Sequence, residues 1–265
     1  LCCRMKPRPA FPAKLDTAVR ARTGTQGAPV APSASTARVP AVPQPQGLGM
    51  DSAAVRMNMV QKLRGQGITD TAVLAAMGAI ERHRFVDSGL VNQAYEDTSL
   101  PIGLGQTISK PGVVSRMAEL MRNGASGKIG RVLEIGTGCG YQAAVLSLLA
   151  TEVYSIERLR GLHDKARDNL RHLRLPNVHL IFGDGMEGYA KGAPYAAIIA
   201  AAGGEAVPQA WVEQLAVGGR LVAPVVTGTG KGSAQALLVL DKTPQGVRQT
   251  LLEPVHFVPL KSGVA

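Results

Sequence analysis

The chain has 265 residues, 45% of them hydrophobic and 4% aromatic, which is enough for one large or two small domains with an aliphatic core. Its formal charge of +10 is concentrated at the start: residues 1–50 carry seven basic residues against Asp16 alone, which is +6 and leaves +4 for the rest of the chain. The body is therefore only mildly basic, and a nucleic-acid-binding function loses most of its support.

Residues 1–49 are rich in Pro, Ala, Arg and small polar residues and show neither helical nor strand periodicity. Such a segment cannot bury enough apolar surface to offset its ordering entropy, so we expect a disordered basic arm. Binding of this arm to an acidic partner remains an alternative, as does a folded protein that begins at Met50 or Met57. The folded domain is predicted over 50–265, with N-terminal helices and a loop in 50–125 and an α/β core in 126–265.

Three helices are predicted ahead of the core, over 51–63, from Asp70 to Ile80 and after Pro111. In the first, apolar residues recur at every fourth position, and Asp70 is a candidate N-cap for the second. Between the second and the third, residues 95–111 contain turn residues but little hydrophilic padding. Long loops of this kind inside a compact domain tend to be functional.

A glycine-rich turn follows a short apolar run that ends at Ile135 and is typical of a buried strand. Gly136, Gly138 and Gly140 occupy alternate positions, and a helix is predicted from Tyr141 onward. Glycines let the backbone turn sharply and approach a ligand closely, and a helix N-terminus presents free N–H groups. The order strand, glycine turn and helix predicts a nucleotide-type binding loop.

The glycine spacing and two acids narrow the class of ligand that this loop is predicted to bind. The spacing is GxGxG rather than the GxGxxG that accommodates a pyrophosphate, and Glu134 stands two residues before the first glycine, where it would repel phosphates but accept hydrogen bonds from an ammonium group. Glu157 ends the next apolar run, at the place where an acid holds ribose hydroxyls. A ligand with a ribose, an amino group and no phosphates fits, and S-adenosylmethionine is such a ligand. The alternative is an ordinary strand–helix turn with two surface acids.

From residue 131 onward strands and helices alternate, which predicts a parallel α/β sheet with right-handed crossovers. Strands are expected near 131–136, 152–157, 178–182, 197–202 and 219–224, and helices near 140–149, 160–173 and 207–216. Asp184 and Gly185 follow the third strand at its carboxyl end, where open α/β sheets bind ligands. Residues 235–240 and 248–258 are predicted to add antiparallel edge strands.

With these pieces placed, the sequence resembles the bacterial protein-L-isoaspartate (D-aspartate) O-methyltransferases from about Val55 to Val264. The motifs that carry the resemblance are Leu100-Pro-Ile-Gly103, Gln106-Thr-Ile-Ser109, Val132-Leu-Glu-Ile-Gly-Thr-Gly138, Tyr154-Ser-Ile-Glu-Arg158, Gly183-Asp-Gly185, Gly218-Gly-Arg-Leu221 and Phe257-Val-Pro-Leu260. The glycine loop marks only the methyltransferase superfamily, whereas Gln-Thr-Ile-Ser is more specific. The resemblance implies a Rossmann-like class I S-adenosylmethionine-dependent methyltransferase fold, a mostly parallel sheet with helices on both faces.

It also implies an activity: transfer of a methyl group from S-adenosylmethionine to the α-carboxylate of L-isoaspartyl (and D-aspartyl) residues, which starts the repair of damaged proteins. By the same likeness Ser109 is the active-site residue. The residues expected to bind the cofactor, by the likeness or by the reasoning above, are Ile102, Gly103, Leu104, Gly105, Glu134, Gly136, Gly138, Glu157, Asp184 and Gly185.

Methyl transfer to a carboxylate requires correct placement of the substrate rather than a general base. A carboxylate with a pKa near ~3.9 is already ionised at neutral pH, and the hydroxyls of Thr107 and Ser109 could orient it as donors. For Ser109 the alternative is an N-cap of the helix that begins near Pro111. Lys110 stands where the family often has Gln, and its charge either attracts a carboxylate substrate or lies in solvent. Cys139 is expected to be a small loop filler.

Near the fourth strand the sequence departs from the family, because Ala196 and Ala197 stand where an acid usually precedes the Ile-Ile pair. Alternatives are therefore a methyltransferase for small molecules or nucleic acids, or a non-catalytic S-adenosylmethionine-binding protein. The Asn/Asp-Pro-Pro-aromatic site of base methyltransferases is missing from residues 200–204.

The expected partners are isoaspartyl proteins and peptides. We expect no nucleic acid, no membrane and no metal, and a monomer. The cysteine spacing predicts a reducing, cytoplasmic location.

Overall fold

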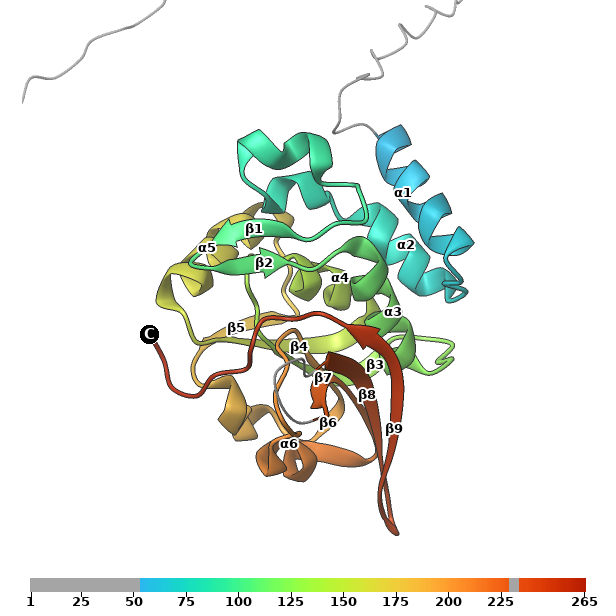
Figure 1. The fold of residues 1–265 in the computed structure, drawn as a ribbon, viewed down its shortest axis with the longest axis vertical. Helices are drawn as coiled ribbons and strands as arrows, with labels where there is room; N and C mark the ends of the chain where they lie inside the picture. The colour runs from blue at the N-terminus through green and yellow to red at the C-terminus, as the bar shows by residue number, and fades with distance from the viewer. Residues whose placement is uncertain (1–52, 229–233) are drawn as a thin grey trace, which may run out of the picture. The chain divides into compact units, whose positions relative to one another are not determined.

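The structure is a computed structural model that describes residues 53–228 and 234–265 (Figure 1). The arm predicted over 1–49 lies outside the described residues. The described part begins with α1 (Ala53–Gly65) and α2 (Thr71–Ala79), which agree with two of the predicted helices. Two short 3₁₀ turns follow, at Arg82–Phe85 and Ser88–Gln93.

The predicted loop over 95–111 contains a small antiparallel hairpin that the sequence did not predict. Its strands are β1 (Leu100–Gly103) and β2 (Gln106–Ile108), and α3 (Pro111–Arg122) follows directly. Strands of four and three residues are too short to show an alternating pattern. The hairpin turn is built from Gly103, Leu104 and Gly105, which all have positive φ (98°, 52° and 69°).

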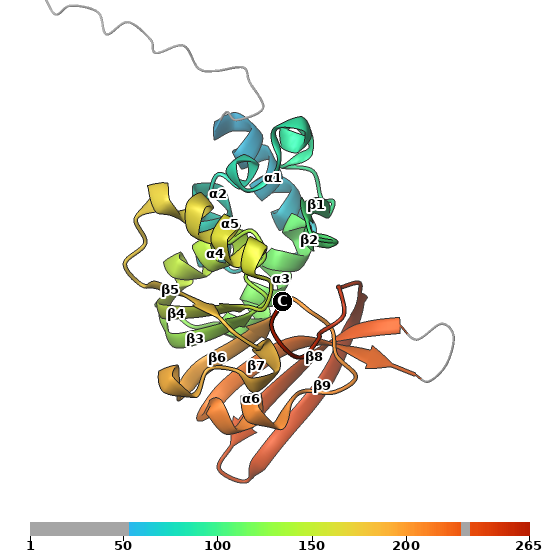
Figure 2. The same ribbon diagram turned by 90° about the vertical axis from the view of Figure 1, so that its left-hand side faces the viewer.

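The core is a seven-stranded sheet with the strand order β5-β4-β3-β6-β7-β8-β9 (Figures 1 and 2). Its strands are β3 (Ile129–Ile135), β4 (Ala150–Glu157), β5 (Val178–Phe182), β6 (Tyr195–Ala200), β7 (Leu215–Thr227), β8 (Ala234–Thr243) and β9 (Gly246–Val255). The first five in spatial order pair in parallel, and β8 and β9 are added antiparallel. The predicted parallel sheet and its antiparallel edge are confirmed.

Helices cover both faces of this sheet. They are α4 (Tyr141–Leu149), α5 (Arg160–Leu170, continued by a 3₁₀ turn over Arg171–Leu173) and the six-residue α6 (Gln209–Gln214), with further 3₁₀ turns at Gly185–Glu187 and Ala190–Gly192. In Figure 2, α4 and α5 lie on one side of the sheet and α6 lies on the other. The helix predicted over 207–216 is thus shorter than expected, because β7 already begins at Leu215.

Side chains of β3 alternate between the two faces of the sheet, and each face has its own packed layer of apolar residues. Val132 packs with Met117 of α3 and Leu146 of α4, whereas the next residue, Leu133, packs with Trp211 of α6 on the opposite face. All five side chains are at most 1% exposed. Successive residues of a strand point to opposite faces, so one buried strand supplies both layers.

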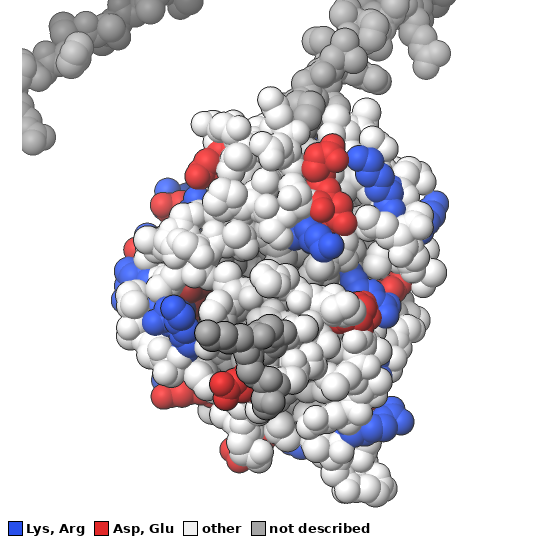
Figure 3. Space-filling view, viewed as in Figure 1, with Lys and Arg blue, Asp and Glu red and all other residues white. Residues whose placement is uncertain are grey.

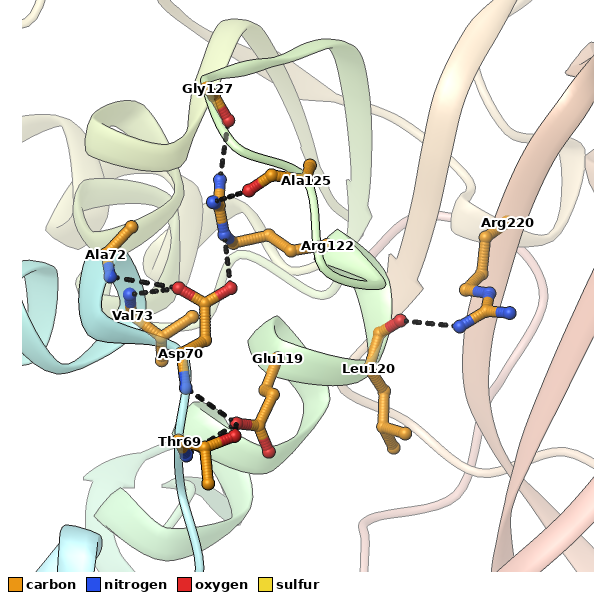
Figure 4. Close-up of polar contacts among 10 residues, drawn as sticks. All are labelled: Thr69, Asp70, Ala72, Val73, Glu119, Leu120, Arg122, Ala125, Gly127 and Arg220. Carbon is orange, nitrogen blue, oxygen red and sulfur yellow. Dashed lines mark hydrogen bonds and ion pairs between the residues drawn. The ribbon is translucent and has the colours of Figure 1, made fainter.

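A buried ion pair ties the N-terminal helices to α3 (Figure 4). Asp70 is the N-cap of α2, as predicted, and its Oδ1 accepts from Ala72 N and Val73 N. Its Oδ2 accepts from Arg122 Nε at 2.7 Å, and that guanidinium also donates to the carbonyls of Gly127 and Ala125. Burial opposes ionisation of the Asp70 carboxyl, but the hydrogen bonds from Arg122 and the backbone outweigh it and hold its pKa below the usual value.

Among the helices of the described residues, none combines the length and the apolar character that crossing a membrane would require.

Candidate active site

The glycine-rich loop lies between the carboxyl end of β3 and the start of α4, and its shape requires glycine. Gly136, Gly138 and Gly140 have φ values of 89°, 57° and 90°, in the left-handed region that side chains disfavour. A Cβ at Gly138 would also approach Ile102 Cδ1 to 3.2 Å. The loop can therefore come close to a ligand and to the β1–β2 hairpin at the same time.

Glu157 stands at the carboxyl end of β4, next to this loop. Its side chain is only 5% exposed, and each carboxylate oxygen accepts one backbone hydrogen bond: Oε2 from Gly138 N and Oε1 from Leu159 N, both at 2.9 Å. The strand end of β4 thus holds a fixed carboxylate beside the loop that follows β3. Each oxygen keeps a second lone pair for a ligand hydroxyl.

A cavity of about 270 Å³ opens at these strand ends. Several separate segments wall it, among them the β1–β2 hairpin with Ser109, the glycine loop, residues 156–159 at the end of β4, and residues 258–261 after β9. Of the predicted site residues, the cavity brings together Ile102, Leu104, Thr107, Ser109, Gly136, Gly138, Glu157 and Gly185. Gly185 admits no side chain, because a Cβ would lie 2.7 Å from Ile135 Cγ2.

Four predicted site residues are not among those that line the cavity. Gly103 and Gly105 form the hairpin turn on either side of Leu104. Both carboxylate oxygens of Asp184 already accept backbone hydrogen bonds, Oδ1 from Met186 N at 2.8 Å and Oδ2 from Gly263 N at 2.5 Å. These residues shape the walls, and their contact with a cofactor stays a prediction.

Glu134 is the fourth. It is fully buried, its Oε2 accepts from the Ser155 hydroxyl, and its Oε1 has no hydrogen-bond partner among the described residues. Burial raises the pKa of this carboxyl to about 8, so it is largely protonated at neutral pH. The alternative of two surface acids is wrong, because Glu134 and Glu157 are both buried. The predicted contact of Glu134 with an ammonium group stays a prediction.

Ser109 does not cap α3. The N-cap position is held by Lys110, without a side-chain bond, and the N–H of Gly112 is instead capped by Asp97 Oδ1 at 2.7 Å. The Ser109 hydroxyl makes no hydrogen bond with another described residue. The N-cap alternative is therefore wrong, and this hydroxyl, with that of Thr107, is available at the cavity wall.

Cys139 lines the cavity as a neutral thiol. It is 2% exposed, and burial raises its pKa to about 11, so the filler role expected from the sequence agrees with its surroundings.

Residues 258–261 line the cavity, which was not predicted from the sequence, although Phe257-Val-Pro-Leu260 was one of the motifs. This segment is held by Gly203, whose N–H donates to Val258 O at 2.8 Å and whose carbonyl accepts from Leu260 N at 2.7 Å. A Cβ at Gly203 would lie 2.5 Å from Gln235 Nε2, so a larger residue at this position would displace the Gln235 side chain. Tyr141 and Gln142 also line the cavity and were not predicted.

A mostly parallel seven-stranded sheet, a GxGxG loop after its central β3 and a carboxylate at the end of the adjacent β4 define a Rossmann-like class I methyltransferase fold. The sequence pattern of the Protein-L-isoaspartate(D-aspartate) O-methyltransferase family matches residues 54–265. The chain belongs to this family.

Relatives support the assignment over nearly the whole chain. A protein-L-isoaspartate O-methyltransferase of Methylibium petroleiphilum is 54% identical over an alignment of 267 positions, which covers 97% of each chain. One of Ralstonia nicotianae is 52% identical over 97% of this chain and 81% of its own length.

Solved structures agree with the fold. A protein-L-isoaspartate O-methyltransferase that is 28% identical superposes with a TM-score of 0.70 over 79% of this chain and 67% of its own. A Plasmodium falciparum protein described by the same name, in complex with S-adenosyl-L-homocysteine, superposes with a TM-score of 0.65 over 78% and 98% at 22% identity, which speaks for the fold alone.

Proposed function

We propose that this protein transfers a methyl group from S-adenosylmethionine to the α-carboxylate of L-isoaspartyl, and D-aspartyl, residues in damaged proteins. The observation that carries the proposal is the cavity, which brings the hydroxyls of Thr107 and Ser109 together with the Glu157 carboxylate at the end of β4. Membership of the family and the names of the relatives support the same activity.

The residues present fit the cofactor. Glu157 offers two fixed oxygens, each with a free lone pair, which suits the two hydroxyls of a ribose. Gly136 and Gly138 expose backbone to the cavity, and the glycine loop itself contains no Lys or Arg. Glu157 and Gly136, with Gly138 and Gly185, would hold the nucleoside part.

When bound, the cofactor supplies an electrophilic methyl group on a positively charged sulfonium. The substrate carboxylate is already an anion, so no base is needed, and no histidine is among the described residues that line the cavity. Thr107 and Ser109 would donate hydrogen bonds to one carboxylate oxygen and leave the other aimed at the methyl group.

The walls contribute by excluding water. Ile102, Ile108 and Val114 are apolar, buried and part of the cavity lining. Methyl transfer joins an anion to a cation and leaves neutral products, so a dry apolar environment disfavours the charged reactants more than the transition state. Solvent exclusion therefore helps this particular reaction.

The departure at Ala196 does not favour another function. Ala196 does not line the cavity, and its Cβ packs against Gly130, where an added Cβ would lie at 3.1 Å. A methyltransferase for small molecules and a non-catalytic binding protein remain outcomes of the test below.

The proposal is tested by methyl transfer from labelled S-adenosylmethionine to a synthetic isoaspartyl peptide and to its normal aspartyl twin. Label should enter the isoaspartyl peptide as a base-labile ester, and the twin should stay unlabelled. Equal labelling of both peptides, or of neither, would overturn the proposal. Cofactor binding without transfer to either would favour the non-catalytic alternative.

We further propose that the protein acts as a monomer in the cytoplasm. The cavity is walled by segments of a single chain, which supports the first part, and the free, buried Cys139 suits a reducing compartment. Light scattering on the purified protein measures the oligomeric state directly.

A further inference from the structure

A second cavity, of about 420 Å³, adjoins the first and shares Ser109 with it. We call it the flanking cavity. It is lined by Ser99, Ser109, Lys110, Val113, Pro254, Val255, His256 and Phe257. The lining combines the start of α3 with the end of β9, an edge strand that pairs only with β8. A peptide whose isoaspartyl carboxylate lies at Ser109 must continue past this residue, and the flanking cavity is open at that point.

The ionisable side chains that line the flanking cavity itself are basic, although Lys110 also borders a neighbouring cavity lined by Asp97 and Glu253. Among the described residues that line the flanking cavity, Lys110 and His256 are ionisable and none carries a carboxylate. Lys110 is exposed, and its side-chain ammonium group makes no ion pair or hydrogen bond with another residue of the described ranges. It is therefore a positive charge without a partner beside the hydroxyl of Ser109.

The neighbouring charged groups are already satisfied. Arg116 pairs with Glu253 at 2.7 Å and with Glu119 at 3.3 Å. Asp97 accepts from Gly112 N at 2.7 Å and from Gln66 Nε2 at 3.2 Å. On the face shown in Figure 3, charged side chains are scattered rather than gathered into a basic patch. Lys110 thus acts as a local charge, not as part of a broad basic surface.

We propose that the flanking cavity receives a side chain next to the isoaspartyl residue of the substrate, and that Lys110 makes an acidic side chain preferred there. This rests on the proposed function and names its substrate class more narrowly. The apolar part of the lining, from Val113, Val255 and Phe257, would contact the stem of a Glu or Asp side chain, while Lys110 meets its carboxylate. Exposed ion pairs are weak, so the preference should be about two- to fivefold.

The test uses two isoaspartyl peptides that differ only in a flanking residue, Glu in one and Gln in the other, made for each side of the isoaspartyl position. The measured quantity is the ratio of kcat/KM for the Glu peptide to that for the Gln peptide. For the unaltered protein the ratio should be about two to five on at least one side and should fall toward one as salt is raised. K110Q should bring it to about one, and K110E should bring it below one. K191Q is the matched control, since Lys191 is exposed and lines neither cavity, and it should keep the original ratio.

The outcomes separate this proposal from the function on which it rests. An unchanged ratio in K110Q overturns the preference while leaving methyl transfer in place. Equal losses of kcat/KM on both peptides also overturn it, because they place Lys110 at the reacting carboxylate instead. If the unaltered protein methylates no isoaspartyl peptide, the proposed function fails and this proposal fails with it.

Discussion

Replacement of Glu157 by alanine is the most direct test of the cofactor site. The carboxylate is 5% exposed and lines the cavity, and its two oxygens hold the N–H groups of Gly138 and Leu159. Loss of hydrogen bonds to a charged acceptor costs about 1.5–3 kcal/mol. Binding of S-adenosylhomocysteine should therefore weaken roughly 10- to 150-fold.

The variant should also be less stable, because two backbone N–H groups at the strand end lose their acceptor. At about 1.5 kcal/mol for each hydrogen bond to this charged acceptor the expected cost is about 3 kcal/mol, which should lower the Tm by several degrees. Glutamine does not restore the site fully, since its amide offers one acceptor for two N–H groups. Glu157→Gln should therefore fall between the unaltered protein and Glu157→Ala in both measurements.

Titration calorimetry measures the affinity, and thermal melting shows that each variant is folded. Glu152→Gln serves as the control, because Glu152 lies on the same strand but is partly exposed and bonded to His179. This control should bind like the unaltered protein. An affinity for Glu157→Ala within about twofold of the unaltered protein, in a folded sample, would remove Glu157 from the cofactor site.

Three further predictions concern Ser109, Asp70 and Glu134. Ser109→Ala should lower kcat/KM for an isoaspartyl peptide about 10- to 100-fold with little change in cofactor affinity or Tm, and normal kinetics would end its assignment. Asp70→Asn keeps the N-cap but leaves the buried Arg122 without its anion, so urea unfolding should show a loss of about 3 kcal/mol. Because the pKa of Asp70 is lowered by folding, its stabilisation is present above its unfolded pKa and lost as the pH falls through the folded value, a dependence that Asn should abolish. Glu134 has a folded pKa of about 8, above its unfolded value, so the stability it contributes is full below about 4.5 and declines as the pH rises to about 8. Glu134→Gln should flatten this decline. Equal slopes of the unfolding free energy against pH for the two proteins, between pH 6 and 8.5, would contradict the reasoning.

Much of the fold could be predicted because the pattern was strong. Short apolar runs alternating with helical segments indicate one topology class, and the end of each parallel strand lies at the same edge of the sheet. This is why Glu157 could be placed beside the glycine loop from the sequence, and the bond from Gly138 N to its carboxylate agrees with that placement.

The surroundings of Glu134 could not be predicted from spacing alone. Its position two residues before Gly136 suggested the mouth of the loop, but side chains on a strand alternate between faces. Glu134 lies on the same side of β3 as Val132, under α4, where Ser155 of the next strand meets it. A residue so near the end of a strand can still be fully buried, and its charge state then depends on neighbours that are distant in sequence.

The C-terminal wall of the cavity was missed for a related reason. Residues 258–261 lie far along the chain from the glycine loop, and nothing local in them indicates which surface they cover. Backbone bonds to Gly203 fix their course, and the chain end beyond them is held where Ala265 N donates to Arg158 O at 2.8 Å. Backbone-to-backbone contacts of this kind leave little mark on side-chain composition, so no periodicity or motif spacing predicts them.

The arrangement separates two tasks that one cavity must perform. Glu157 and the glycine loop belong to the ends of the paired strands β4 and β3, and we propose that they act on the cofactor side. Thr107 belongs to the hairpin and Ser109 lies between it and α3, and we propose that both act on the substrate side. Because the reaction needs neither a base nor a nucleophile from the protein, catalysis depends on the relative placement of these two groups. Changes at Glu157 should therefore appear in cofactor affinity and changes at Ser109 in substrate turnover, and a variant that moved both together would show that the two walls are not independent.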